Sequence, residues 1–140
     1  MNLCNKRSLT IQVKGSKAYK PKRKNKELYG EGSNGWFFVD KFKIKNNTAD
    51  YFIFNVHIIS DNLKKGRKEL STHLIIIKPK DLYRICKKKK ILHKRFSFYI
   101  WVNPKEKKAF DFRDSNKKGI VDFTDYLDEN GIKSMKKYLV

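Results

Sequence analysis

Residues 51–59 have the sequence YFIFNVHII, and this stretch decides the class of fold. It holds no charged side chain, and its aromatic and β-branched residues favour strands, so we predict a buried strand over Tyr51–Ile59. The next apolar run, His73–Ile77, predicts a second buried strand. Towards the N-terminus, Leu9–Lys14 alternates apolar and polar residues and predicts a strand with two unlike faces. The chain is therefore built around a β-sheet.

Further strands and helices are predicted on both sides of these runs. Trp36–Lys45 is predicted to be extended, and Phe96–Val102 to form a hairpin with Ala109–Phe112 through a turn at Asn103–Lys108. Helices are predicted near Lys26–Tyr29, after Pro79, over Ile120–Leu127, and at the end of the chain, where Ile132, Met135, Tyr138 and Leu139 share one face. After Pro79, the stripe is formed by Leu82, Ile85, Cys86 and Leu92.

These elements predict an α/β or α+β fold with one central mixed sheet of about five strands and flanking helices. The chain has 140 residues, the size of one domain, so we predict a single domain over residues 1–140. Within it, residues 15–35 are predicted to form a long basic loop and residues 120–140 a C-terminal helical segment. A loop of that length in a compact domain usually serves a function or is disordered.

The charge of the chain points to a polyanionic partner. Lys and Arg number 34 against 14 Asp and Glu, a net charge of +20. Nine basic residues and no acidic one lie between Met1 and Lys26, and sixteen basic against three acidic residues lie between Lys64 and Lys108. An A/T-rich genome would favour Lys over Arg, but it would not make acidic residues scarce. Nucleic acid is the first expectation, and an anionic membrane surface or an acidic protein the second.

Several classes of protein are excluded by the sequence. No apolar run approaches the ~20 residues of a membrane helix, and the first residues lack the apolar core of a signal peptide. Cys4 and Cys86 are isolated and are expected to be ordinary reduced thiols. No metal or cofactor motif is present, and His57, His73 and His93 lie in strand or basic runs rather than in ligand sets. We expect a cytoplasmic protein that does not bind membranes and holds no metal or cofactor.

One short motif indicates chemistry. The predicted strand has the sequence TIQVKG over residues 10–15, which places Gln12 and Lys14 on the same face. This pair resembles the second half of the PD-(D/E)xK nuclease motif, in the variant where glutamine replaces the acid. In that family the acid and an upstream aspartate hold Mg²⁺, and the lysine stabilises or activates the attacking water. The resemblance makes Gln12 and Lys14 the candidate catalytic residues.

The order of the following segments extends the resemblance over most of the chain. Trp36–Phe38, Ala49–Phe54 and Leu74–Pro79 are similar to a succession found in bacterial restriction-endonuclease-like proteins. Asp111–Arg113 and Tyr126–Leu127 lie where that set often carries a Phe/Arg stretch and a final helix. The resemblance implies a restriction-endonuclease-like core.

The front half of the family's site is missing from this sequence. The metal-binding aspartate of the family lies on a strand before the QxK strand, yet none of the first 26 residues here is acidic. The resemblance therefore implies a truncated core that binds nucleic acid without cutting it. Alternatively, a missing N-terminal segment or a partner chain completes an Mg²⁺-dependent DNA endonuclease; in a homodimer, Glu27, Glu31 or Asp40 could lie beside the other copy's Lys14. A third interpretation is a basic interaction or immunity protein that binds an acidic protein.

Two surfaces are predicted to bind nucleic acid. The first joins Lys14 to the basic loop: Lys17, Lys20, Lys22, Arg23, Lys24 and Lys26, with Tyr19, Tyr29 and Trp36 interleaved. The second comprises Lys87, Lys88, Lys89, Lys90, Lys94 and Arg95, which would equally suit a solvated helix face. Trp36 is expected in the core because two phenylalanines follow it. Since Lys far outnumbers Arg, we expect salt-sensitive contacts to the DNA backbone with little sequence specificity.

Overall fold

The computed structural model describes residues 8–88, 95–112 and 121–139. The elements, in chain order, are β1 (Ile11–Gly15), α1 (Arg23–Tyr29), β2 (Ser33–Asp40), α2 (Lys41–Lys45), β3 (Tyr51–Asn62), β4 (Arg67–Ile77), α3 (Pro79–Lys88), β5 (Arg95–Asn103), β6 (Lys108–Asp111), β7 (Val121–Asp122), the 3₁₀ turn η1 (Thr124–Tyr126) and α4 (Glu129–Leu139). The fold is α+β. The predicted single sheet of about five strands is instead two sheets: sheet A, ordered β1-β3-β4, and sheet B, ordered β2-β5-β6-β7.

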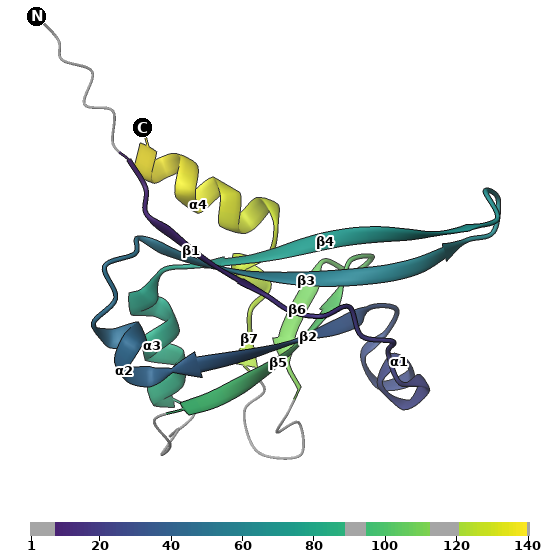
Figure 1. Ribbon diagram of the computed structural model, residues 1–140, viewed down its shortest axis with the longest axis horizontal. Coiled ribbons are helices and arrows are strands. Elements are labelled where there is room, and N and C mark those ends of the chain that lie inside the picture. Colours follow the sequence, from purple (N-terminus) through teal and green to yellow (C-terminus); the bar gives the residue numbers. More distant parts are fainter. Residues whose placement is uncertain (1–7, 89–94, 113–120, 140) are drawn as a thin grey trace, which may run out of the picture.

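Sheet A is built around β3, which contains the apolar stretch Tyr51–Ile59. Strand β3 pairs with β4 in an antiparallel hairpin from Phe52 opposite Ile77 to Asn62 opposite Arg67. Strand β1 pairs with the other edge of β3 in parallel, because α1, β2 and α2 carry the chain back between them. Both faces of β3 are buried near its start, since one face packs against sheet B and the other against α4 (Figure 1). Further along, the hairpin leaves the body as a projecting arm (Figure 1).

The main core lies between the two sheets. Strand β2 alternates, and its inward residues include Gly35, Phe37 and Val39. The Phe37 ring meets the Phe54 ring of β3 edge to face, with 5.0 Å between ring centroids. Gly35 allows this close approach, because a Cβ there would lie 2.7 Å from the Phe37 ring and 3.2 Å from Val56. The alternation that buries Phe37 turns its two neighbours, Trp36 and Phe38, to the outer face of sheet B.

Two predicted segments are wrong in type over part of their length. The extended segment predicted over Trp36–Lys45 ends as a strand at Asp40, because the Asp40 carboxylate accepts hydrogen bonds from the backbone N–H groups of Phe42 and Lys43 and caps helix α2. The helix predicted over Ile120–Leu127 begins outside the described residues and continues as β7 and η1. There Val121 pairs with Asp111, and the Asp122 carboxylate accepts from Thr124 N, which starts the turn.

The remaining helices follow the prediction more closely. Helix α3 begins at Pro79 and buries Leu82 and Cys86, as the apolar stripe predicts. Helix α4 covers the outer face of sheet A, where the Ser134 and Tyr51 hydroxyls lie 3.1 Å apart. Each helix in the described part of the chain is too short or too polar to cross a membrane.

The start of α4 is held to sheet A by Asp128. Its backbone N–H donates to Leu74 O, its carboxylate accepts from Leu74 N at 2.8 Å, and the same carboxylate lies 2.8 Å from His73 Nδ1. Asp128 has a φ of 46°, a left-handed conformation that Asp and Asn adopt more readily than other side chains. One residue therefore caps the edge of β4 and directs the chain into α4.

Replacing Asp128 with alanine is expected to lower the free energy of unfolding by about 2 kcal/mol, because a partly buried N–H loses its acceptor and alanine tolerates the positive φ poorly. Asp128→Asn keeps an oxygen acceptor and the tolerance for that backbone conformation, so its loss should be about half as large. Urea denaturation of both variants measures the difference. Equal losses would mean that the Leu74 hydrogen bond and the backbone conformation contribute little.

Because of Tyr126, the free energy of unfolding is expected to vary with pH in the alkaline range. Burial raises the pKa of the Tyr126 hydroxyl, and the Asp81 carboxylate raises it further, against a smaller opposing effect of Arg84. A pKa that is higher in the folded state stabilises the fold below the unfolded value of 10.0, and this contribution is lost as the pH rises through the folded value. We expect the stability of Tyr126→Phe to fall less steeply above pH 10 than that of the unmodified chain, in urea titrations. Parallel curves would contradict this.

Candidate nucleic-acid interface

Strand β1 carries the predicted catalytic pair at the edge of sheet A. Gln12 and Lys14 lie opposite Phe52 and Phe54 and share their face of the sheet. The Gln12 amide oxygen accepts a hydrogen bond of 2.9 Å from Asn47 Nδ2, and the Gln12 side chain is exposed. Lys14 is half-buried. The structure therefore brings the two motif residues to one face, with Asn47 as the neighbour of Gln12.

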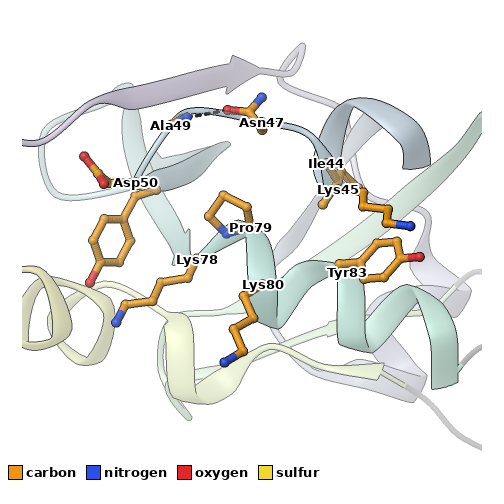
Figure 2. Close-up of a pocket in the computed structure, with 10 residues that line it drawn as sticks. Ile44, Lys45, Asn47, Ala49, Asp50, Lys78, Pro79, Lys80 and Tyr83 are labelled. Atoms are coloured by element: carbon orange, nitrogen blue, oxygen red, sulfur yellow. Dashed lines mark hydrogen bonds between the residues drawn. The ribbon is translucent and has the colours of Figure 1, made fainter.

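Asn47 also lines a pocket of about 580 Å³ between the end of α2 and the start of α3 (Figure 2). Three lysines line it, Lys45, Lys78 and Lys80. Its one carboxylate, Asp50, accepts a hydrogen bond from Thr10 N at 2.8 Å, which ties β1 to β3. In Figure 2 the Lys78 and Lys80 amines point away from that carboxylate. The pocket thus offers cations rather than ligands for a cation.

Elsewhere among the described residues, no cluster of carboxylates could bind a metal ion in place of this pocket. Across residues 8–88, 95–112 and 121–139, no three His, Cys, Asp or Glu side chains come together in a way that could hold a metal ion. Metal-assisted phosphodiester cleavage needs such ligands beside the reacting phosphate. In the part of the chain that the structure describes, Gln12 and Lys14 therefore contribute an amide and a cation, without a cluster of metal ligands beside them.

The basic loop is fastened along the free edge of β2. We call residues 17–26 the basic segment. At its start, Ser16 Oγ accepts a hydrogen bond from Trp36 N at 2.9 Å, and further on Ser33 Oγ donates to Tyr19 O at 2.9 Å. The chain then turns into α1, a helix that lies within the predicted loop. Two serine side chains thus hold the basic segment against the strand that displays Trp36 and Phe38.

Most cations of the basic segment form no ion pair within the described part of the chain. Arg23 forms an ion pair with Glu27 at 3.0 Å and Lys26 one with Glu31 at 3.4 Å. The other four cations form no ion pair with any described residue, and their side chains are exposed: Lys17, Lys20, Lys22 and Lys24. These four amines are therefore available to an external anion.

The described residues of the second predicted surface lie elsewhere on the molecule. Lys87 of α3 places its amine 5.3 Å from the centroid of the Tyr83 ring, and Arg95 is exposed at the start of β5. Lys88 ends α3 without a described side chain, and Lys89, Lys90 and Lys94 lie outside the described residues. Figure 1 places α1 and α3 at opposite ends of the body, so Lys87 of α3 lies apart from the basic segment.

The expectation that Trp36 belongs to the core is wrong. Its side chain lies on the outer face of sheet B and is 37% exposed, and Phe38 beside it is 64% exposed. Trp36 stacks on Tyr99, its cross-strand partner on β5, with 5.6 Å between ring centroids and 13° between ring planes. The Phe38 ring lies 4.8 Å from Trp36. We call Trp36, Phe38 and Tyr99 the aromatic strip.

Tyr29, in contrast, is an anchor that seats α1. Its ring centroid lies 5.8 Å from that of Trp101, 5.1 Å from Phe110 and 5.5 Å from Phe112. Helix α1 therefore covers one end of the outer face of sheet B, where Trp101 is fully buried, and leaves Trp36 and Phe38 exposed. Tyr99 was not singled out from the sequence, although its place in the alternating run Phe96–Val102 puts it on the face opposite Phe98 and Ile100.

Comparisons of this chain with protein-family models, with curated proteins and with solved structures find no match.

Proposed function

We propose that this protein binds nucleic acid, and that the basic segment forms the principal contact to the phosphate backbone. The observation that carries this proposal is a segment with six cations and no acid whose start is fixed along the edge of β2, four of the cations forming no ion pair with a described residue. Lysine amines that neutralise phosphates release counterions, which drives binding without regard to base sequence. We expect weak binding with low sequence specificity.

Part of the proposal concerns ancestry. Gln12 and Lys14 share one face of a strand that pairs in parallel with β3, and this supports a restriction-endonuclease-like origin for a domain that binds without a complete catalytic centre. A second candidate is an Mg²⁺-dependent endonuclease completed by another chain. It is favoured by the position of β1, which has a strand partner on one side only within the described part of the chain.

Fluorescence anisotropy tests the proposal. Labelled oligonucleotides are titrated with the protein at several salt concentrations in the presence of Mg²⁺, and the products are then separated on a gel. We expect micromolar binding that weakens steeply as salt rises, and intact oligonucleotide. Absence of binding at low salt would overturn the proposal and leave the acidic-protein partner as the better interpretation. Cleavage would instead support the endonuclease.

A further inference from the structure

The aromatic strip is an unusual surface for a chain with this charge. Trp36, which stacks on Tyr99, is 37% exposed, and the Phe38 ring 4.8 Å away is 64% exposed, so these rings leave apolar surface open to water. Because the chain has a net charge of +20, a partner that covers these rings must also be compatible with many cations or bind them. Unpaired nucleotides do both, since they carry a phosphate and an exposed aromatic face on every unit.

The structure places the start of the basic segment beside β2, the strand that carries Trp36 and Phe38 of the aromatic strip. Trp36 donates its backbone N–H to Ser16, and Lys17 is the next residue along, so phosphate-binding amines begin beside the strip. From there the basic segment continues along the strand edge to Tyr19, whose carbonyl accepts from Ser33. A strand of nucleic acid laid on the outer face of sheet B would therefore meet aromatic rings across its bases and lysines along its backbone.

A duplex does not suit this surface. Its base faces are stacked on one another, so it could use the basic segment but not the rings. An acidic protein would satisfy the charge, but it offers no repeating flat face to a parallel pair of rings. Resting on the proposed function, we infer that the preferred ligand is single-stranded nucleic acid, with bases stacked on the aromatic strip and phosphates held by the basic segment.

The test uses fluorescence anisotropy to measure the affinity of the chain for four labelled probes. Three are single strands of equal charge, namely oligothymidylate, oligouridylate and an abasic oligonucleotide, and the fourth is a duplex. The unmodified chain is expected to bind the two base-containing single strands at least about fivefold more tightly than the abasic backbone. The two single-stranded arms separate DNA from RNA as the source of the bases, and either preference supports the inference.

Two variants locate the contact. Trp36→Ala and Phe38→Ala should each weaken oligothymidylate binding roughly fivefold or more and leave the abasic affinity unchanged, since only base stacking is removed. The matched control is Leu70→Ala, because Leu70 is 64% exposed like Phe38 but lies on β4 of sheet A. That variant should bind every probe as the unmodified chain does.

A third variant gives a direct optical signal. The chain has two tryptophans, so Trp101→Phe leaves Trp36 as the single indole fluorophore. Its emission should be quenched by oligothymidylate and not by the abasic oligonucleotide at equal saturation. Equal affinity for base-containing and abasic strands, or unquenched Trp36, would overturn the inference while the proposed function stands. No binding of any probe at low salt would overturn both.

Discussion

Replacing Lys17, Lys20, Lys22 and Lys24 together with glutamine is expected to flatten the salt dependence of single-strand binding by about 3 units of log Kd per log salt. The four amines are exposed and form no ion pair with a described residue, so each is ready to replace a counterion on a phosphate. Between 50 and 200 mM salt, the unmodified chain should therefore lose roughly 50-fold more affinity than the variant.

The control must carry the same change in net charge. Lys64, Lys68, Lys133 and Lys137 are exposed and lie on the β3–β4 arm and on α4, away from β2. Their replacement by glutamine also lowers the net charge by four, so it reports how much the overall field of the protein contributes. We expect its salt slope to stay close to that of the unmodified chain. If both variants lost the same slope, the basic segment would not be the contact surface.

Arg23 and Lys26 are left unchanged in this design for a structural reason. Both belong to the basic segment by sequence, but each already faces a glutamate on or just after α1. An exposed ion pair of this kind is weak, and a phosphate that displaced the glutamate would gain less than one that met an unpaired amine. The basic run in the sequence does not distinguish the six cations, whereas the ion pairs on and just after α1 do.

The sheet elements were the most predictable part of this fold. β-Branched and aromatic runs located β3 and the end of β4, and alternation located β1 and β5, because local sequence decides which face of a strand is buried. The division into two sheets was not predictable, since it depends on β1 pairing with β3 and β2 pairing with β5 across long stretches of chain. Short polar caps such as Asp40 and Asp122 overrode the apolar pattern at two positions.

The candidate interface was predictable only in its charges. The basic run of residues 17–26 is visible in the sequence, but its attachment to β2 depends on two serine side chains, Ser16 and Ser33. Trp36 was assigned to the core because apolar neighbours follow it. In a strand, burial depends on which of the alternating positions face inward, and here these are Gly35, Phe37 and Val39. Trp36 lies one position away from them and therefore faces the surface.

The two tryptophans illustrate how neighbouring elements, rather than residue type, decide burial. Both lie on the outer face of sheet B, where Trp36 pairs with Tyr99 and Trp101 with Asn34 across β2 and β5. Trp101 is covered by Tyr29 of α1 and by Phe112, with ring centroids 5.8 and 5.9 Å away, and it is fully buried. Trp36 lies beyond the reach of these side chains and keeps an exposed face.

Trp101→Ala is accordingly expected to lower the free energy of unfolding by about 3–5 kcal/mol, because it leaves a large cavity under α1. Trp36→Ala should cost only about 1 kcal/mol, the value of its ring stacking at a partly exposed position. Urea denaturation of both variants measures the contrast. Comparable losses would mean that α1 does not seat on Trp101 in solution.

Trp101→Phe separates the size of the ring from its polar atom. The Trp101 indole N–H is buried and has no hydrogen-bond partner among the described residues, which carries a desolvation cost of about 1–3 kcal/mol. Phenylalanine fills much of the same space and removes that buried donor, so the two effects oppose each other and the net loss should stay below about 1.5 kcal/mol. A loss as large as that of Trp101→Ala would show that the indole N–H has an acceptor in solution. A small loss would show that the ring packing of Trp101 against Tyr29, rather than its indole N–H, contributes most to holding α1 on sheet B.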